Sequence, residues 1–215
     1  HMFILNIATG VSKRISTNEE GVGQFSWSPD SKWIAFVQSA NNTMAQLFVS
    51  NVDTGDSFPI TTDRANSLWP AWSPDGKFIY FLSDRSFTTL VGSPWGARQP
   101  EPYFDASEKI YHIALQKGTR SPFRPNDELA TKTENPDSKE ADKKDEPKQS
   151  VTVKIDKDGI AERIEEVPVS PGNYRGLEVT KKGLYLLSRE TGVGAKTHVG
   201  VVKITNDDPK LVTMI

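Results

Sequence analysis

Residues 25–38 read FSWSPDSKWIAFVQ, and residues 70–83 read PAWSPDGKFIYFLS. Each copy is an apolar strand that ends in a tryptophan, followed by a four-residue turn and a second strand rich in aromatic and branched residues. Proline presets φ at the second turn position, aspartate suits the third, and Gly76 accepts a positive φ at the fourth. Ser31 replaces that glycine in the first copy, where it costs about 1 kcal/mol of backbone strain unless the turn relaxes.

The spacing of the two copies predicts the fold. Trp27 and Trp72 lie 45 residues apart, which is the length of one four-stranded propeller blade. A second phrase also recurs, because residues 3–16 resemble residues 46–61, and the later copy follows the tryptophan hairpin. Residues 3–16 are therefore expected to be the outer half of a blade. The sequence predicts an all-β chain, a partial β-propeller of about three and a half four-stranded antiparallel blades.

The repeat divides the chain into consecutive units of a single propeller segment over residues 1–215. The expected units are an outer half-blade at 1–18, a blade at 19–64, an interrupted blade at 65–169 with insertions at 86–108 and 116–150, and a last blade at 170–215. No helix longer than two turns is expected within residues 20–85.

The two insertions have different compositions. Prolines at positions 94, 100 and 102 remove ladder donors, so the first insertion is predicted to leave the blade. Residues 126–150 contain eight acidic and five basic residues and no aromatic side chain. Such a segment cannot bury enough apolar surface to offset its ordering entropy, so a mobile loop is predicted there. A strand is expected to resume at residues 151–155.

Composition excludes several classes of protein. The chain of 215 residues is 36% hydrophobic and 25% charged, as expected of a globular domain. The net charge of -2 argues against nucleic acid as a general partner. No apolar run approaches the roughly 20 residues that span a bilayer, and the absence of cysteine excludes disulfides and thiolate metal sites. His1-Met2 is typical of a cloning remnant, so the natural N-terminus is expected to lie outside this sequence.

The sequence offers no catalytic, cofactor-binding or metal-binding residue. It lacks a nucleophile elbow, a zinc-protease motif, a phosphate-binding glycine loop and a calcium loop. His112 and His198 are expected to be ordinary strand residues. The tryptophans at 27, 69 and 72 are expected to be wedged between blades.

One stretch is a candidate recognition surface. Trp95, Arg98 and Gln99 lie in the first insertion, and Trp and Arg often anchor interfaces. The alternative is structural, with Trp95 covering an adjacent blade and Arg98 paired with an acidic neighbour.

The motifs resemble a known family. The Trp-Ser-Pro-Asp-Gly turn and the strand after it are similar to the propeller repeat of TolB, dipeptidyl-peptidase-type enzymes and tricorn proteases. The non-repeating part resembles a propeller segment of tricorn-like serine peptidases of the S41 type over about residues 20–190. The stretches that carry this likeness are Ser83-Asp84-Arg85, Tyr103-Phe104-Asp105, Ile110–Leu115, Thr119–Pro125, Val153–Ile160, Arg163, Val167–Val169 and Gly172–Tyr174.

The resemblance implies a non-catalytic segment of a larger cytoplasmic peptidase that degrades oligopeptides. Its partners would be the other domains of the parent enzyme and the parent's peptide substrates, and the segment would guide peptide access or mediate assembly. Two alternatives stay open: a TolB-like interaction propeller, for which a periplasmic location is not excluded, and the lid propeller of a prolyl-oligopeptidase-like hydrolase. A propeller of fewer than four whole blades should not close on itself, so self-association is also expected.

Overall fold

The computed structural model describes residues 1–17, 21–86, 89–90, 103–126 and 151–214. Over these ranges the chain forms antiparallel sheets and one short 3-10 helix, η2 (Ile160–Arg163), with no α-helix among them. The all-β prediction is confirmed, and so is the expected absence of a long helix from the described part of residues 20–85. No helix of the described residues is long and apolar enough to cross a membrane.

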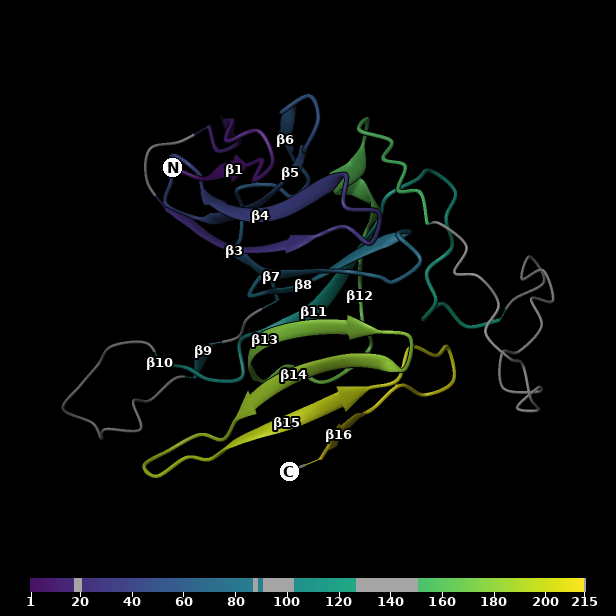
Figure 1. The fold of residues 1–215 in the computed structure, drawn as a ribbon. Helices are drawn as coiled ribbons and strands as arrows, with labels where there is room; N and C mark the ends of the chain where they lie inside the picture. The colour runs from purple at the N-terminus through teal and green to yellow at the C-terminus, as the bar shows by residue number, and fades with distance from the viewer. Residues whose placement is uncertain (18–20, 87–88, 91–102, 127–150, 215) are drawn as a thin grey trace.

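Three sheets of four strands follow one another, and each is a propeller blade (Figure 1). The first blade has the order β3 (Val22–Trp27), β4 (Trp33–Ser39), β5 (Ala45–Asn51) and β6 (Ser57–Pro59). The second has the order β7 (Ser67–Trp72), β8 (Phe78–Ser83), β11 (Lys109–Ala114) and β12 (Ile164–Glu166). The third has the order β13 (Asn173–Thr180), β14 (Gly183–Arg189), β15 (Thr197–Val202) and β16 (Leu211–Thr213).

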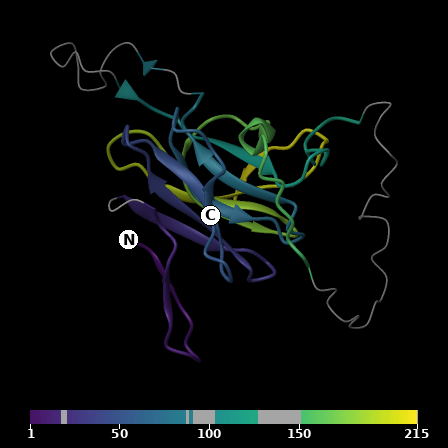
Figure 2. The same ribbon diagram turned by 90° about the horizontal axis from the view of Figure 1, so that it is seen from above.

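Two short hairpins accompany the blades. At the N-terminus, β1 (Phe3–Leu5) pairs with β2 (Ser12–Arg14), as expected for an outer half-blade. Its tip extends beyond the three blades (Figure 2). Between β8 and β11, the short strands β9 (Thr89–Leu90) and β10 (Tyr103–Phe104) pair with each other and with no blade.

The turn between the first two strands is built in the same way in the first and second blades. Ser73 Oγ donates to Asp75 Oδ1 at 2.6 Å and accepts from the Phe78 amide at 2.9 Å. Ser28 makes the corresponding bonds, to Asp30 at 2.6 Å and from the amide of Trp33 at 2.9 Å. The serine hydroxyl of each turn is therefore satisfied by hydrogen bonds within its own blade.

The hydrophobic core lies in the seams between blades. The first strands are neighbours, since β3 lies beside β7 and β7 beside β13. We call the contact between the first and second blades the first seam, and that between the second and third blades the second seam. The first seam buries Ala35, Val37, Leu47, Val49, Trp72, Ile79, Phe81, Tyr111 and Ile113. The second seam buries Ala71, Phe78, Tyr80, Leu82, Ile110, Tyr174, Leu177, Leu184, Leu186 and Val202.

A smaller cluster covers the outer side of the first blade. Ile15, at the end of the N-terminal hairpin, is buried against Ile34, Phe36 and Phe48, and Ile4 packs beside them. The hairpin thus covers part of this side, while the inner strand β3 remains partly uncovered.

The prediction of a strand at residues 151–155 is wrong. These residues pair with no strand, because the place beside β11 is occupied by β12. Val153 is instead buried in the first seam, and its amide donates to Asp30 Oδ2 at 2.9 Å. The stretch is therefore an extended connection anchored on the turn of the first blade.

Candidate functional site

A pocket of about 790 Å³ opens where the turns of the three blades meet. We call it the turn-face pocket. It lies between the β7–β8 turn and the β13–β14 turn, over the side chains of β8 that face the second seam. Its lining residues are Pro29, Ser73, Pro74, Asp75, Phe78, Tyr80, Pro122, Val151, Thr180, Lys181 and Ile204.

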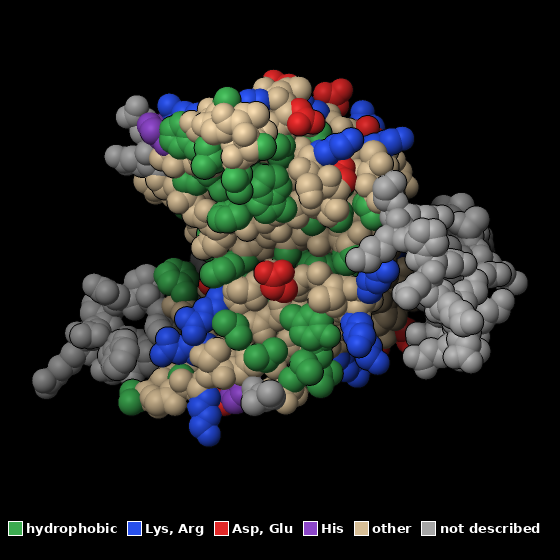
Figure 3. Space-filling model, viewed as in Figure 1, with side chains coloured by type: hydrophobic (Ala, Val, Ile, Leu, Met, Phe, Trp, Pro, Cys, Tyr) green, Lys and Arg blue, Asp and Glu red, His purple; other side chains and the backbone are tan. Residues whose placement is uncertain are grey.

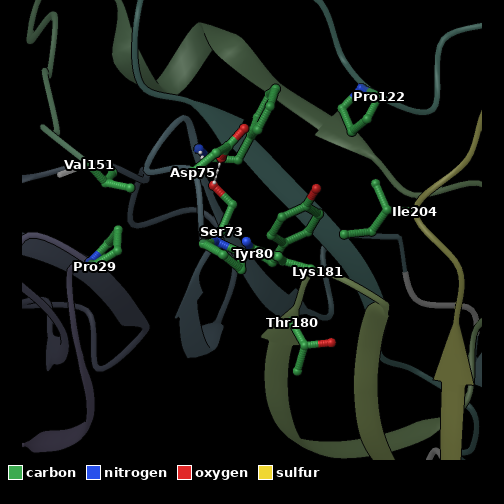
Figure 4. Close-up of a pocket in the computed structure, with 11 residues that line it drawn as sticks. Pro29, Ser73, Asp75, Tyr80, Pro122, Val151, Thr180, Lys181 and Ile204 are labelled. Atoms are coloured by element: carbon green, nitrogen blue, oxygen red, sulfur yellow. Dashed lines mark hydrogen bonds between the residues drawn. The ribbon is translucent and has the colours of Figure 1, made fainter. Parts of the chain in front are cut away.

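The pocket is elongated and draws on distant parts of the chain. Figure 4 shows Pro29 and Val151 at one end, Pro122 and Ile204 at the other, and Tyr80 between them. Pro122 and Val151 both lie in the long connection between β11 and β12, so two separate stretches of this connection reach the lining. Three blades and this connection must therefore be in place before the pocket exists.

Tyr80 is the most deeply placed polar side chain of the pocket. The residue is 1% exposed, and no hydrogen bond of its hydroxyl is found among the described residues. Burial, together with the negative charge of Asp75, raises the pKa of Tyr80 above its usual range. The side chain therefore stays a neutral hydroxyl that can donate and accept a hydrogen bond.

His112 lies behind Tyr80, in the same aromatic cluster. Its ring centroid is 5.7 Å from that of Tyr80, 5.4 Å from that of Phe78 and 5.6 Å from that of Phe123. Burial lowers the pKa of His112 to about 4, against an opposing hydrogen bond with the backbone of Glu165. Among the described residues, no hydrogen-bond partner is found for its Nδ1. His112 is thus a neutral core residue, as the sequence predicts.

The rim of the pocket carries one acid and one base. Asp75 accepts from Ser73 Oγ and, at 3.1 Å, from the amide of Lys77, and its side chain is 52% exposed. Lys181 lies on the β13–β14 turn, is exposed, and forms no ion pair among the described residues. The two charges come from different blades, and Asp75 also forms an ion pair with Lys77, whose Nζ lies 3.8 Å from Asp75 Oδ2.

A smaller hollow of about 290 Å³ lies at the opposite ends of the strands. It is formed by the loops after β4, β6 and β8, and is lined by Met44, Thr62, Arg64, Ala65, Asp84 and Arg85. Arg85 lies over the rings of Phe81 and Tyr111, with its guanidinium carbon 5.2 and 5.0 Å from the two centroids. These contacts, and the hydrogen bond that the amide of Asn66 donates to Asp84 Oδ1, organise the loops of this face.

The two outer sides of the row of blades carry exposed apolar side chains. On the first blade, Phe25 is 58% and Trp27 is 45% exposed, and we call this surface the first open face. On the third blade, the second open face is formed by residues that neighbour one another across β14, β15 and β16. They are Tyr185, Leu187, Val199, Val201 and Val212. Figure 3 shows hydrophobic side chains gathered on the surface over both of these blades.

The three tryptophans of the inner strands differ in their surroundings. Trp72 is 6% exposed and lies in the first seam, as predicted, and Trp69 packs against the core of the second seam. The prediction that Trp27 is wedged between blades is wrong for the described structure. Its cross-strand neighbour Ile34 belongs to the outer cluster rather than to the first seam, so Trp27 faces away from the second blade.

The described residues contain no group of three or more histidine, aspartate or glutamate side chains that could hold a metal ion. His198 bonds through Nε2 to Glu190 Oε1 at 2.8 Å, on the edge of the third blade. The candidate recognition residues Trp95, Arg98 and Gln99 lie outside the described residues, so this surface stays a prediction. The turn-face pocket was not predicted, because its lining comes from the turns of three blades and from the connection between β11 and β12, which are far apart in the sequence.

Three successive four-stranded blades, joined through their inner strands, define a β-propeller segment. The chain belongs to the family described as "Tricorn protease second beta propeller domain", which matches residues 1–211. The predicted resemblance to the propellers of tricorn proteases is therefore confirmed. No curated protein matches the chain.

Solved structures show the same fold. A crystal structure of the tricorn protease is 19% identical with a TM-score of 0.72, and the match covers 98% of this chain and 20% of that one. A putative TolB from Agrobacterium tumefaciens is 12% identical with a TM-score of 0.55, over 95% of this chain and 53% of that one. Hydrazine synthase from Kuenenia stuttgartiensis is 11% identical with a TM-score of 0.59, over 96% and 27%. The chain thus spans between a fifth and about half of the length of these proteins.

Proposed function

We propose that this chain is a non-catalytic propeller segment of a larger tricorn-like serine peptidase of the S41 type, in which it guides oligopeptides or supports assembly. The observation that carries the proposal is the family match over residues 1–211. The parent enzyme would act on oligopeptides in the cytoplasm, and the other domains of that enzyme would be the partners of this segment.

The chemistry of the described residues supports a non-catalytic role. His112 is buried among aromatic rings with a lowered pKa, so it does not reach a substrate as a base. His198 is oriented by Glu190, but the sequence contains no nucleophile motif that would complete such a pair. Peptide bond cleavage is therefore assigned to another part of the parent enzyme.

The open faces support a role in assembly. A closed propeller covers both sides of every blade, whereas the exposed Phe25 and Trp27 on one side and Leu187 and Val199 on the other have no cover within the described chain. Further blades or a second copy of the chain would bury these surfaces. The same surfaces could join the segment to the rest of the peptidase.

Two measurements on a fluorogenic oligopeptide test the proposal. The purified 215-residue chain should not hydrolyse it, and the complete gene product should. Deleting this segment from the complete protein should lower turnover of an octapeptide more than turnover of a dipeptide reporter, because only the longer substrate needs guidance. Hydrolysis by the isolated chain above a mock-purified control would contradict the non-catalytic role. Equal losses for the two substrates would contradict the guiding role.

A further inference from the structure

We propose that the turn-face pocket binds an uncharged aromatic or large aliphatic side chain of an oligopeptide, and that the Tyr80 hydroxyl hydrogen-bonds to the backbone of this guest. The choice of a peptide as guest rests on the proposed function. The size, lining and polarity of the pocket are independent of that function.

The size and lining of the pocket suit an apolar guest. A volume of about 790 Å³ falls in the range of roughly 300–1000 Å³ that is usual for ligand pockets. Phe78 and Tyr80 present aromatic surface from β8, and Ile204 and Pro122 form an apolar wall opposite Pro29 and Val151. A phenyl or branched aliphatic side chain that enters the pocket would be transferred from water to a largely apolar surface, which is favourable.

The Tyr80 hydroxyl provides the polar contact. Figure 4 shows the hydroxyl pointing toward the space between Pro122 and Ile204. The residue is 1% exposed, and no partner is found for the hydroxyl among the described residues. The hydroxyl faces the pocket, so the amide or carbonyl of a guest can form a hydrogen bond with it in place of water.

The charges of the rim argue against an ionic guest. Asp75 and Lys181 carry opposite charges from different blades, so neither an anion nor a cation meets a field of one sign. The neutral, hydrogen-bonding backbone of a peptide suits this arrangement.

The lining is held in place by bonds that need no ligand. Asp30 Oδ2 accepts from the amide of Val153, which fixes the segment that carries Val151. Ser73 and Asp75 are tied into the β7–β8 turn at 2.6 Å. A preformed pocket loses little conformational entropy when a guest enters.

The test measures binding to the 215-residue chain by fluorescence anisotropy. The probes are two fluorescein-labelled neutral hexapeptides that differ only in the central residue, phenylalanine or alanine. We expect the phenylalanine peptide to bind about tenfold or more tightly, as burial of a phenyl ring predicts. Tyr80→Phe removes only the hydroxyl and should weaken binding about three- to tenfold. Ile204→Trp narrows the end of the pocket that lies beside the Tyr80 hydroxyl and should abolish the preference for phenylalanine.

Matched control variants distinguish binding in the pocket from non-specific binding to apolar surface and from the effects of unfolding. Tyr185→Phe removes a tyrosine hydroxyl on the second open face, and Val193→Trp adds a tryptophan on the exposed β14–β15 turn; neither should change binding. Unchanged affinity in both Tyr80→Phe and Ile204→Trp, with cooperative unfolding retained, would overturn the proposal. Equal affinity of the wild-type chain for the two peptides would also overturn it. The assay needs no peptidase activity, so its failure is distinguishable from a failure of the proposed function.

Discussion

Trp72 Nε1 donates a hydrogen bond of 3.0 Å to the main-chain carbonyl of Ser26, and this bond joins the inner strand of the second blade to that of the first. Trp72 is 6% exposed, whereas Trp27, at the same position of the preceding repeat, is 45% exposed. Two equivalent residues thus occupy different environments, because one faces a neighbouring blade and the other does not.

This difference predicts unequal effects of the same substitution. Trp72→Phe leaves the carbonyl of Ser26 without its donor and opens space in the first seam, so it should lower the free energy of unfolding by about 1–3 kcal/mol. Trp27→Phe should change it by no more than about 0.5 kcal/mol. Urea unfolding of both variants measures the difference, and similar losses would show that Trp27 is also covered in solution.

Ser31 and Gly76 occupy equivalent positions in the first and second turns, and exchanging these residue types is predicted to have opposite effects on stability. Ser31 has a φ of 59° and Gly76 a φ of 69°, and a Cβ on Gly76 would lie 2.8 Å from Cγ2 of Val153. Gly76→Ser should therefore destabilise the chain by about 1–3 kcal/mol. Ser31→Gly should be neutral or stabilise it by up to about 1 kcal/mol, because it relieves the left-handed strain. Thermal unfolding of the two variants gives the answer, and a stabilising Gly76→Ser would contradict the conformational argument.

His112 predicts a loss of stability on mild acidification. Its pKa is about 4 in the folded chain and 6.5 as an unperturbed group, so between these values the unfolded chain binds a proton that the folded chain does not. The free energy of unfolding should thus be unaffected by His112 above about pH 7 and fall as the pH decreases, by about 2 kcal/mol at pH 5. Urea midpoints at pH 7 and pH 5 measure this change. His112→Phe, which keeps an aromatic ring at the site, should show a smaller decrease, and an equal decrease would assign the effect to other groups.

The open faces predict self-association at micromolar concentration. Each face exposes apolar side chains that a propeller normally covers, and their burial favours contact with a second copy. Light scattering should give a mass above the 23.9 kDa of one chain, decreasing on dilution. Leu187→Glu combined with Val199→Glu should shift the chain toward the monomer. Val193→Glu, on the β14–β15 turn, should not, although Val193 is 96% exposed. A monomeric mass that does not depend on concentration would refute the prediction.

The sequence was sufficient for the strands of the three blades. The spacing of Trp27 and Trp72 predicted the repeat, and the strands on either side of the two turns, β3 and β4 and then β7 and β8, lie where the repeated stretches placed them. The reason is that alternation along a strand and the Ser-Pro-Asp turn act through near neighbours in the chain. Ser28 and Ser73 show this locality, because each bonds to an aspartate two residues later.

The sequence was not sufficient where the outcome depends on another blade. Residues 151–155 have the alternation of a strand, yet Val153 bonds to Asp30, 123 residues away, because β12 occupies the edge of β11. A local sequence pattern does not show which segment will pair with the edge of a sheet, because strand pairing depends on contacts with distant parts of the chain.

What the sequence by itself determined is therefore the blade and its turns. The tertiary structure alone decided that Trp72 is buried while Trp27 is exposed, that Tyr80 lies at a pocket between turns, and that His112 remains uncharged behind it. The physical reason is that turn geometry is set by bonds over a few residues, whereas burial, and with it pKa and pocket shape, is set by side chains that meet only after the blades are side by side.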